Sequence, residues 1–204
     1  MKISGVLYAL RIKKMININE ALRYLGYKGS DIPENVRGLI DFCEKKAESV
    51  VSEKFVYKKF ELVKNGNEIL FKDTSLKVVS KNLSDILRDC SQAYLLAVTV
   101  GIDADRTIRE YMVSEPEKGV LLDSMFSVMA DTLADNVQLE IERLCKKTLS
   151  FRFSPGYGDL SLSCQHDIIK LLDAQKKIGL FVTSSQMLTP TKSVTAILGV
   201  KDMQ

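Results

Sequence analysis

The chain has 204 residues, of which 46% are hydrophobic and 27% charged, so it is long enough to bury a sizeable core and too apolar to be disordered. The net charge of +3 is too small to indicate a nucleic-acid-binding surface, which needs a clustered basic face. Four cysteines without a CxxC pair, no signal peptide and no long apolar run predict a cytoplasmic protein that does not bind membranes.

The first 79 residues predict helices followed by strands. A short helix is expected before Gly26, and a second helix over residues 31–51 opens with the capping-box pair Asp31 and Glu34. From residue 55 to residue 79 the apolar period falls to two. Asn65-Gly66, which tolerates positive φ angles, predicts a tight hairpin turn within this antiparallel region.

The second half contains the longest periodic segment of the chain. Residues 80–92 predict a capped helix, and a buried strand over 93–101 and a short helix over 103–112 follow. From about Pro116 to Lys147, apolar residues recur every three or four positions, which predicts a helix spanning on the order of 45 Å. The methionines on this helix are expected to fill the core.

The C-terminal quarter predicts a strand ending near Arg152, a helix near residues 162–177 stopped by Gly179, and strand-like segments at 179–184 and 193–200. We therefore expect an α+β fold with an antiparallel sheet and a long central helix. The simplest organisation is one domain over residues 1–204, with a helical region at 1–52 and a core at 53–204.

Two familiar kinds of site are disfavoured by their spacing. His166 is the one histidine of the chain, and with Cys164 it supplies at most two metal ligands, so a metal site is not expected. The segment VTVGID at 98–103 faintly resembles the strand-to-glycine-loop opening of Rossmann-type methyltransferases. A single glycine is a weak basis for that interpretation.

The segment FRFSPGYGD at 151–159 is the strongest candidate for a binding loop. Pro155-Gly156 favours a turn, and Gly158 permits a close backbone approach. The planar guanidinium of Arg152 could hold a carboxylate while Tyr157 covers an apolar or aromatic group. The alternative is a structural loop in which Arg152 pairs with a neighbouring acid such as Asp159.

Over about residues 93–200 the sequence resembles the S-adenosylmethionine-binding activation (reactivation) domain of cobalamin-dependent methionine synthase. The resemblance includes A-D-x-L-A-[ED] in the long helix and an R-x-x-P-G-Y element, followed by a Leu-Leu pair, T-x-S and P-x-x-S-V-[ST]. The matching residues here are Ala130, Asp131, Leu133, Ala134, Asp135, Arg152, Pro155, Gly156, Tyr157, Leu171, Leu172, Thr183, Ser185, Pro190, Ser193, Val194 and Thr195.

The resemblance implies a site and a role. In that family the domain presents S-adenosylmethionine to the synthase's own cobalamin, so that the inactive cob(II)alamin state is reduced and remethylated. Arg152 would then hold the methionyl carboxylate, and Asp135 would face the ammonium group. The pocket would be lined by Tyr157 and by the loop backbone of Ser154, Pro155 and Gly156.

The sequence also departs from the family pattern. The position of Asp135 is commonly Glu, KKTLSF lacks an acidic residue that precedes the Arg motif in the large synthases, and no Tyr-containing extension follows the S-V-[ST] strand. No cobalamin-binding module is present, so the chain is expected to act in trans on a methionine synthase lacking this domain, with a flavodoxin-like or other low-potential reductant. The alternative is a docking or regulatory subunit of a corrinoid methyltransferase that has lost S-adenosylmethionine binding.

Overall fold

The computed structural model describes residues 4–5, 16–27 and 34–202. The expected helix start at Asp31 lies outside these residues. The expected single-domain organisation stays a prediction, although the first two helices, α1 (Ile18–Tyr24) and α2 (Glu34–Val50), both pack against the long helix α5 (Pro116–Cys145). None of the described helices combines the length and the apolar character needed to cross a membrane.

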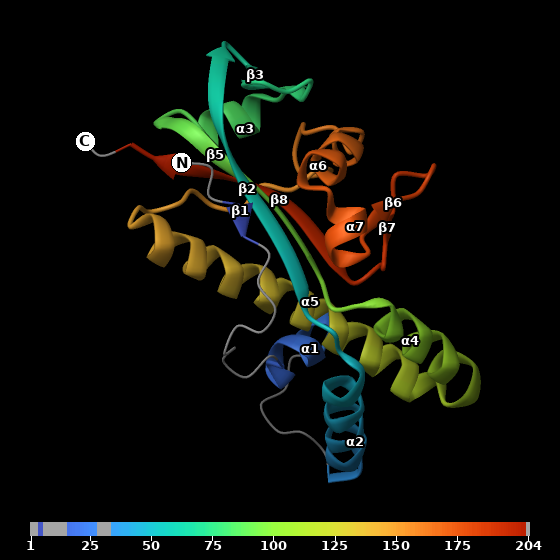
Figure 1. Cartoon of the computed structure of the whole chain (residues 1–204). Helices are drawn as coiled ribbons and strands as arrows, with labels where there is room; N and C mark the ends of the chain where they lie inside the picture. Colours follow the sequence, from blue (N-terminus) through green and yellow to red (C-terminus); the bar gives the residue numbers. More distant parts are fainter. Residues whose placement is uncertain (1–3, 6–15, 28–33, 203–204) are drawn as a thin grey trace.

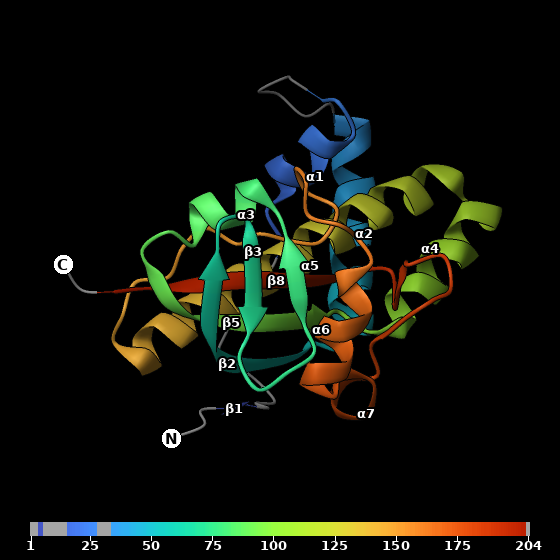
Figure 2. The same ribbon diagram turned by 90° about the horizontal axis from the view of Figure 1, so that it is seen from above.

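A twisted antiparallel sheet forms the centre of the molecule, in the strand order β4-β3-β2-β5-β8, and β1 pairs with β2 (Figures 1 and 2). The long strands β2, β5 and β8 pair over most of their lengths, from Lys54 opposite Thr99 to Glu61 opposite Gln92 in the first pair. The strands are β1 (Ser4–Gly5), β2 (Lys54–Asn65), β3 (Glu68–Phe71), β4 (Lys77–Val79), β5 (Cys90–Thr99) and β8 (Ser193–Lys201).

The predicted hairpin joins β2 to β3, but its turn is shifted by one residue. Asn65 pairs with Glu68, so the two loop residues are Gly66 and Asn67. Of these, Gly66 has a positive φ of 60°, as the first central residue of a type II′ turn requires. Asn65 therefore closes the ladder and does not supply a positive φ angle.

Helices cover both faces of the sheet, because side chains along each strand alternate between the faces. From β2 and β5, Phe55, Tyr57 and Leu96 pack against the C-terminal half of α5. Residues of the opposite parity, such as Val56 and Leu95, pack against α6 (Cys164–Leu172), α7 (Ala174–Ile178) and α3 (Lys81–Ile86), on the side away from α5 (Figure 1).

The long helix α5 confirms the periodicity of the sequence and ends at Cys145, where Lys146 adopts a left-handed conformation. Its N-terminal half forms a separate core with α1, α2 and α4 (Ile102–Ser114), in which Met125 and Met129 are fully buried. Gly119 lets α4 and α5 approach closely: a Cβ at this position would lie 2.7 Å from the Met112 backbone nitrogen. The methionines therefore fill the core, as predicted.

After residue 160, two elements differ from the prediction. The helix expected over residues 162–177 is divided into α6 and α7, because Asp173 adopts a left-handed conformation with φ 54°. The strand-like segment after Gly179 contributes only β6 (Phe181–Val182), which pairs with β7 (Leu188–Thr189) in a small hairpin separate from the main sheet.

Candidate functional site

A cavity of about 380 Å³ lies where the segment after α5 meets the beginning of β8, and we call it the ligand cavity. It brings together residues from α5, the 152–157 segment, α6, β7 and β8, which are far apart in the sequence. The lining residues are Asp131, Arg152, Ser154, Pro155, Tyr157, Gln165, Leu188, Ser193, Val194 and Thr195.

The PGY element forms a tight turn that closes one side of the ligand cavity. The backbone N–H of Tyr157 donates to the carbonyl of Ser154 at 3.1 Å, and Gly156 has a φ of 88°. Pro155 followed by a positive-φ glycine is the residue pair that a type II turn prefers. The turn buries Pro155 and leaves the Tyr157 side chain 68% exposed at the rim.

The next two residues anchor this turn to α3. Gly158 lies so close to α3 that a Cβ there would be 2.5 Å from Asn82 Oδ1, which confirms the predicted close approach. The Asp159 carboxylate accepts hydrogen bonds from the Ser80 hydroxyl and from the backbone N–H groups of Lys81 and Asn82. These hydrogen bonds lower the pKa of Asp159, and the carboxylate caps the N-terminus of α3.

Arg152 is positioned by a bulge and not by the regular strand that was expected. The 149–153 segment follows the outer edge of β8, where Ser150 bonds to Gly199 and Phe153 bonds to Ile197. Between these two contacts the segment advances three residues and β8 advances two, so the segment contains one extra residue, as in a β-bulge. Only isolated bridges form, Phe151 is left 88% exposed, and the Arg152 side chain is largely buried.

The partner of Arg152 is Asp135 on α5, to which the guanidinium Nη1 donates. The alternative pairing with Asp159 is therefore wrong, because the bonds to α3 already hold that carboxylate. The structure brings all the predicted site residues to one region, since Ser154, Pro155 and Tyr157 line the ligand cavity and Gly156 forms their turn. Asp135 contacts Arg152 but is not among the lining residues.

Gln165 and Leu188 were not named from the sequence, and four further lining residues were named there only as motif matches and not as site residues: Asp131, Ser193, Val194 and Thr195. Gln165 is buried, donates to the carbonyl of Gln186 at 2.9 Å and accepts from the Thr195 hydroxyl at 3.2 Å, so it ties α6 to the β6–β7 loop and to β8. Leu188 comes from the short hairpin. Asp131 lies in the family's helix motif, one turn before Asp135, and that spacing on a helix could have indicated it.

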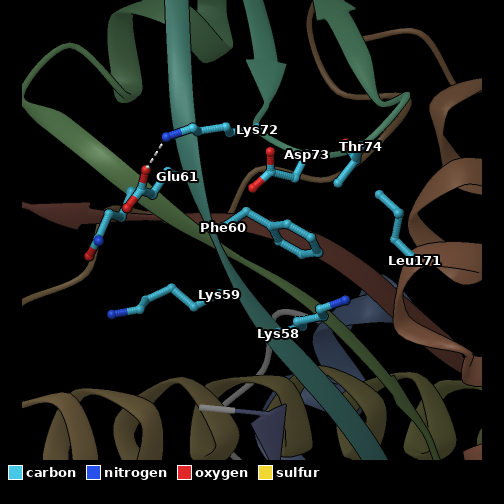
Figure 3. A pocket seen from close by; sticks show the side chains of 9 residues that line it. Lys58, Lys59, Phe60, Glu61, Lys72, Asp73, Thr74 and Leu171 are labelled. Carbon is cyan, nitrogen blue, oxygen red and sulfur yellow. Dashed lines mark hydrogen bonds and ion pairs between the residues drawn. The ribbon is translucent and has the colours of Figure 1, made fainter. Parts of the chain in front are cut away.

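A second cavity, of about 340 Å³, lies beside β2 and the β3–β4 turn (Figure 3). Lys58 stands over the Phe60 ring, and Lys72 is paired with Glu61 at 3.2 Å. With Lys59, the cavity carries three lysines against two carboxylates. Its charged lining is thus positive overall, whereas the charged lining of the ligand cavity is one Asp and one Arg.

Neither of the two weaker interpretations of the sequence gains support. The strand of the VTVGID segment, β5, is antiparallel to both neighbours, whereas a Rossmann-type site needs parallel strands. His166 is exposed on α6. Among residues 4–5, 16–27 and 34–202, no three His, Cys, Asp or Glu side chains cluster to hold a metal ion.

Comparison with known proteins supports the fold. No protein-family model and no curated protein matches the chain. Among solved structures, the chain is similar to the crystal structure of the MetH reactivation domain bound to AdoHcy, with a TM-score of 0.75 and 15% sequence identity. The similarity covers 100% of this chain and 80% of that one. The expected α+β architecture, a curled antiparallel sheet with a long helix like that of the MetH reactivation domain, is thereby confirmed.

Proposed function

We propose that this chain binds S-adenosylmethionine in the ligand cavity and supports the reductive remethylation of a cobalamin-dependent methionine synthase in trans, in the cytoplasm. The observation that carries the proposal is the meeting of Arg152 and the PGY turn at one cavity. The fold supports it, because the similar MetH reactivation domain binds AdoHcy, the demethylated form of the same ligand.

The residues around the cavity fit such a ligand. Arg152 carries a rigid fork of donors suited to a carboxylate, and its largely buried side chain is held against α5. Backbone at Ser154–Gly156 and the exposed ring of Tyr157 would line the nucleoside side. The protein's part is to bind and orient the ligand, which raises the effective concentration of the methyl donor.

The chemistry itself belongs to the two bound groups. The partner's reduced cobalamin would supply the nucleophile for the methyl group of the sulfonium, with S-adenosylhomocysteine as the leaving group. Among the residues lining the ligand cavity there is no cysteine or histidine to take the methyl group in its place. We therefore propose a methionine synthase lacking this domain as the partner, with a flavodoxin-like or other low-potential reductant as the electron donor.

One observation favours the second candidate, a docking or regulatory subunit that no longer binds S-adenosylmethionine. Arg152 is already neutralised by Asp135. A ligand carboxylate must compete with that pair or share the guanidinium with it, which weakens binding unless a partner completes the site. The two candidates differ in whether the isolated chain binds S-adenosylmethionine.

Isothermal titration with S-adenosylmethionine tests the proposed site. The Arg152→Ala variant removes the charge-assisted fork, so binding should weaken by about 2–3 kcal/mol. The Arg152→Lys variant should rescue only part of this loss, because an ammonium offers a point charge in place of a planar fork. Equal affinity in the wild type and Arg152→Ala would remove Arg152 from the site.

The activity needs a partner assay. A cobalamin-dependent methionine synthase lacking this domain is prepared in the cob(II)alamin state and mixed with the chain, S-adenosylmethionine and a low-potential reductant. The absorption spectrum should show methylcobalamin forming at a rate that depends on the chain and that Arg152→Ala lowers. S-adenosylmethionine binding without any acceleration by a cognate partner would favour the docking or regulatory subunit.

A further inference from the structure

The two charged side chains that line the ligand cavity, Asp131 and Arg152, have opposite signs and come from different segments of the chain. Arg152 comes from the bulged segment, and Asp131 comes from α5. The α-carboxylate and α-ammonium of an amino acid are themselves an opposite pair on one carbon. The cavity thus offers a complementary partner for each charge of such a ligand.

Asp135 is placed for a different task. It lies one helical turn after Asp131, outside the lining of the cavity, and accepts a hydrogen bond from the Nη1 atom of Arg152. This bond fixes the guanidinium at one end and leaves its Nη2 and Nε donors for a ligand. Asp135 is thereby engaged by a cation that belongs to the protein, whereas Asp131 has no cationic partner among the described residues.

The Asp131 carboxylate is bound by a residue of the N-terminal helix α1. The Tyr24 hydroxyl donates to Asp131 Oδ2 at 3.2 Å, across 107 residues of sequence. Partial burial, and then the negative charge of Asp131, raise the pKa of Tyr24, so the phenol remains a donor at neutral pH. The helix is fixed on α5 by Ala21, whose carbonyl accepts from the buried Ser124 hydroxyl.

We propose that Asp131, oriented by Tyr24 from the N-terminal helical region, binds the α-ammonium group of the ligand, while Asp135 acts through Arg152 as a positioning residue. This inference rests on the proposed function, since it assigns the amino-acid end of the same site. It gives the N-terminal region a part in ligand recognition. It also divides the two acids of the α5 motif into a binding residue and a positioning residue.

Three ligands separate these tasks in isothermal titrations. S-adenosylmethionine carries both charged groups, its decarboxylated form keeps the ammonium alone, and 5′-methylthioadenosine lacks both. The Asp131→Asn variant should bind the first two about tenfold or more weakly than the wild type, and the third equally well, because a hydrogen bond between charged groups is lost only where the ammonium is present. Tyr24→Phe should show the same selectivity with a smaller loss.

The Asp135→Asn variant gives the opposite selectivity if it acts through Arg152. It should bind S-adenosylmethionine more weakly, because the guanidinium is no longer held in place, and should bind the decarboxylated form equally well. Tighter binding of S-adenosylmethionine would show that Asp135 only competes with the ligand carboxylate, and would overturn its positioning role. Two variants serve as matched controls: Asp103→Asn removes one exposed acid from α4, and Tyr111→Phe removes one phenol that packs on Phe42. Neither control should change the affinity for any of the three ligands, and thermal melts establish that each variant is folded.

The outcomes are distinct. If the wild type binds none of the three ligands, the proposed function fails, and the inference fails with it. If the wild type binds S-adenosylmethionine but Asp131→Asn binds it equally well, the inference alone is overturned. A loss of affinity for the decarboxylated form in Asp135→Asn, and not in Asp131→Asn, would instead place the ammonium on Asp135.

Discussion

Replacing Gly158 by Ala tests whether the binding loop depends on its contact with α3. Gly158 has a φ of 54°, and a Cβ added there would lie 2.5 Å from Asn82 Oδ1. That oxygen accepts the backbone N–H of Asp159 at 3.3 Å, so it cannot turn away without losing the bond. The substitution therefore combines a strained backbone conformation with a broken anchor.

The magnitude follows from these two contributions. A left-handed conformation costs an alanine about 1–2 kcal/mol relative to glycine. Losing one neutral hydrogen bond costs about 1 kcal/mol more. The free energy of unfolding of Gly158→Ala should therefore fall by about 2–3 kcal/mol, as measured by urea denaturation with an unchanged denaturant dependence.

Gly66 offers a matched control. Its φ is 60°, but nothing lies within 4 Å of a Cβ built there. The Gly66→Ala variant should therefore lose only the backbone contribution of about 1–2 kcal/mol. S-adenosylmethionine affinity should fall in Gly158→Ala, because the turn that carries Tyr157 shifts, and should remain unchanged in Gly66→Ala.

Equal destabilisation of the two variants would refute the steric argument, because it would mean that the contact with Asn82 contributes nothing. Unchanged ligand affinity in Gly158→Ala, together with the expected loss of stability, would refute the link between the α3 contact and the ligand cavity. In that case the turn keeps its conformation without its anchor.

Two further predictions concern stability. Hydrogen bonds lower the pKa of Asp159, so the stabilisation that its carboxylate provides is present above the unfolded pKa of about 4 and is lost as the pH falls through the folded pKa. The difference in melting temperature between the wild type and Asp159→Asn should therefore become smaller below about pH 4. A constant difference from pH 7 to pH 3 would contradict this. Gly119→Ala places a Cβ against the Met112 backbone and should lower the free energy of unfolding, measured by urea denaturation, by about 1–3 kcal/mol. Gly38→Ala, in open space on α2, should not lower it, and equal effects of the two substitutions would contradict the close contact between α4 and α5.

The parts of the fold that follow from short-range patterns could be predicted from the sequence. The apolar repeat of α5 continues through some thirty residues, and helix length and end follow from it. The hairpin was predicted to within one residue from Asn65-Gly66. The break at Asp173 was missed, because the helical pattern continues across it and residues other than glycine adopt a left-handed conformation only in a few per cent of cases.

The binding loop of the candidate site could be predicted from the sequence, whereas its contacts with residues far away in the sequence could not. The Arg152 and Tyr157 positions followed from the turn residues, and their gathering with Asp135 followed from the family resemblance. The Ser80 hydroxyl that bonds to Asp159 lies 79 residues away at the N-cap of α3, and no local spacing indicates such a contact. The bulge before Arg152 arises from pairing with β8, so the sequence of the segment alone does not encode it.

The cap that Asp159 provides to α3 also makes that helix a reporter of the binding loop. The amide hydrogens of Lys81 and Asn82 are bonded to the carboxylate, so each exchanges with solvent only when the loop leaves α3. A ligand that holds the PGY turn in place should slow deuterium uptake at these two amides, although neither residue lines the ligand cavity. Ligand occupancy could then be followed by the deuterium content of a peptide that lies 77 to 78 residues before Asp159.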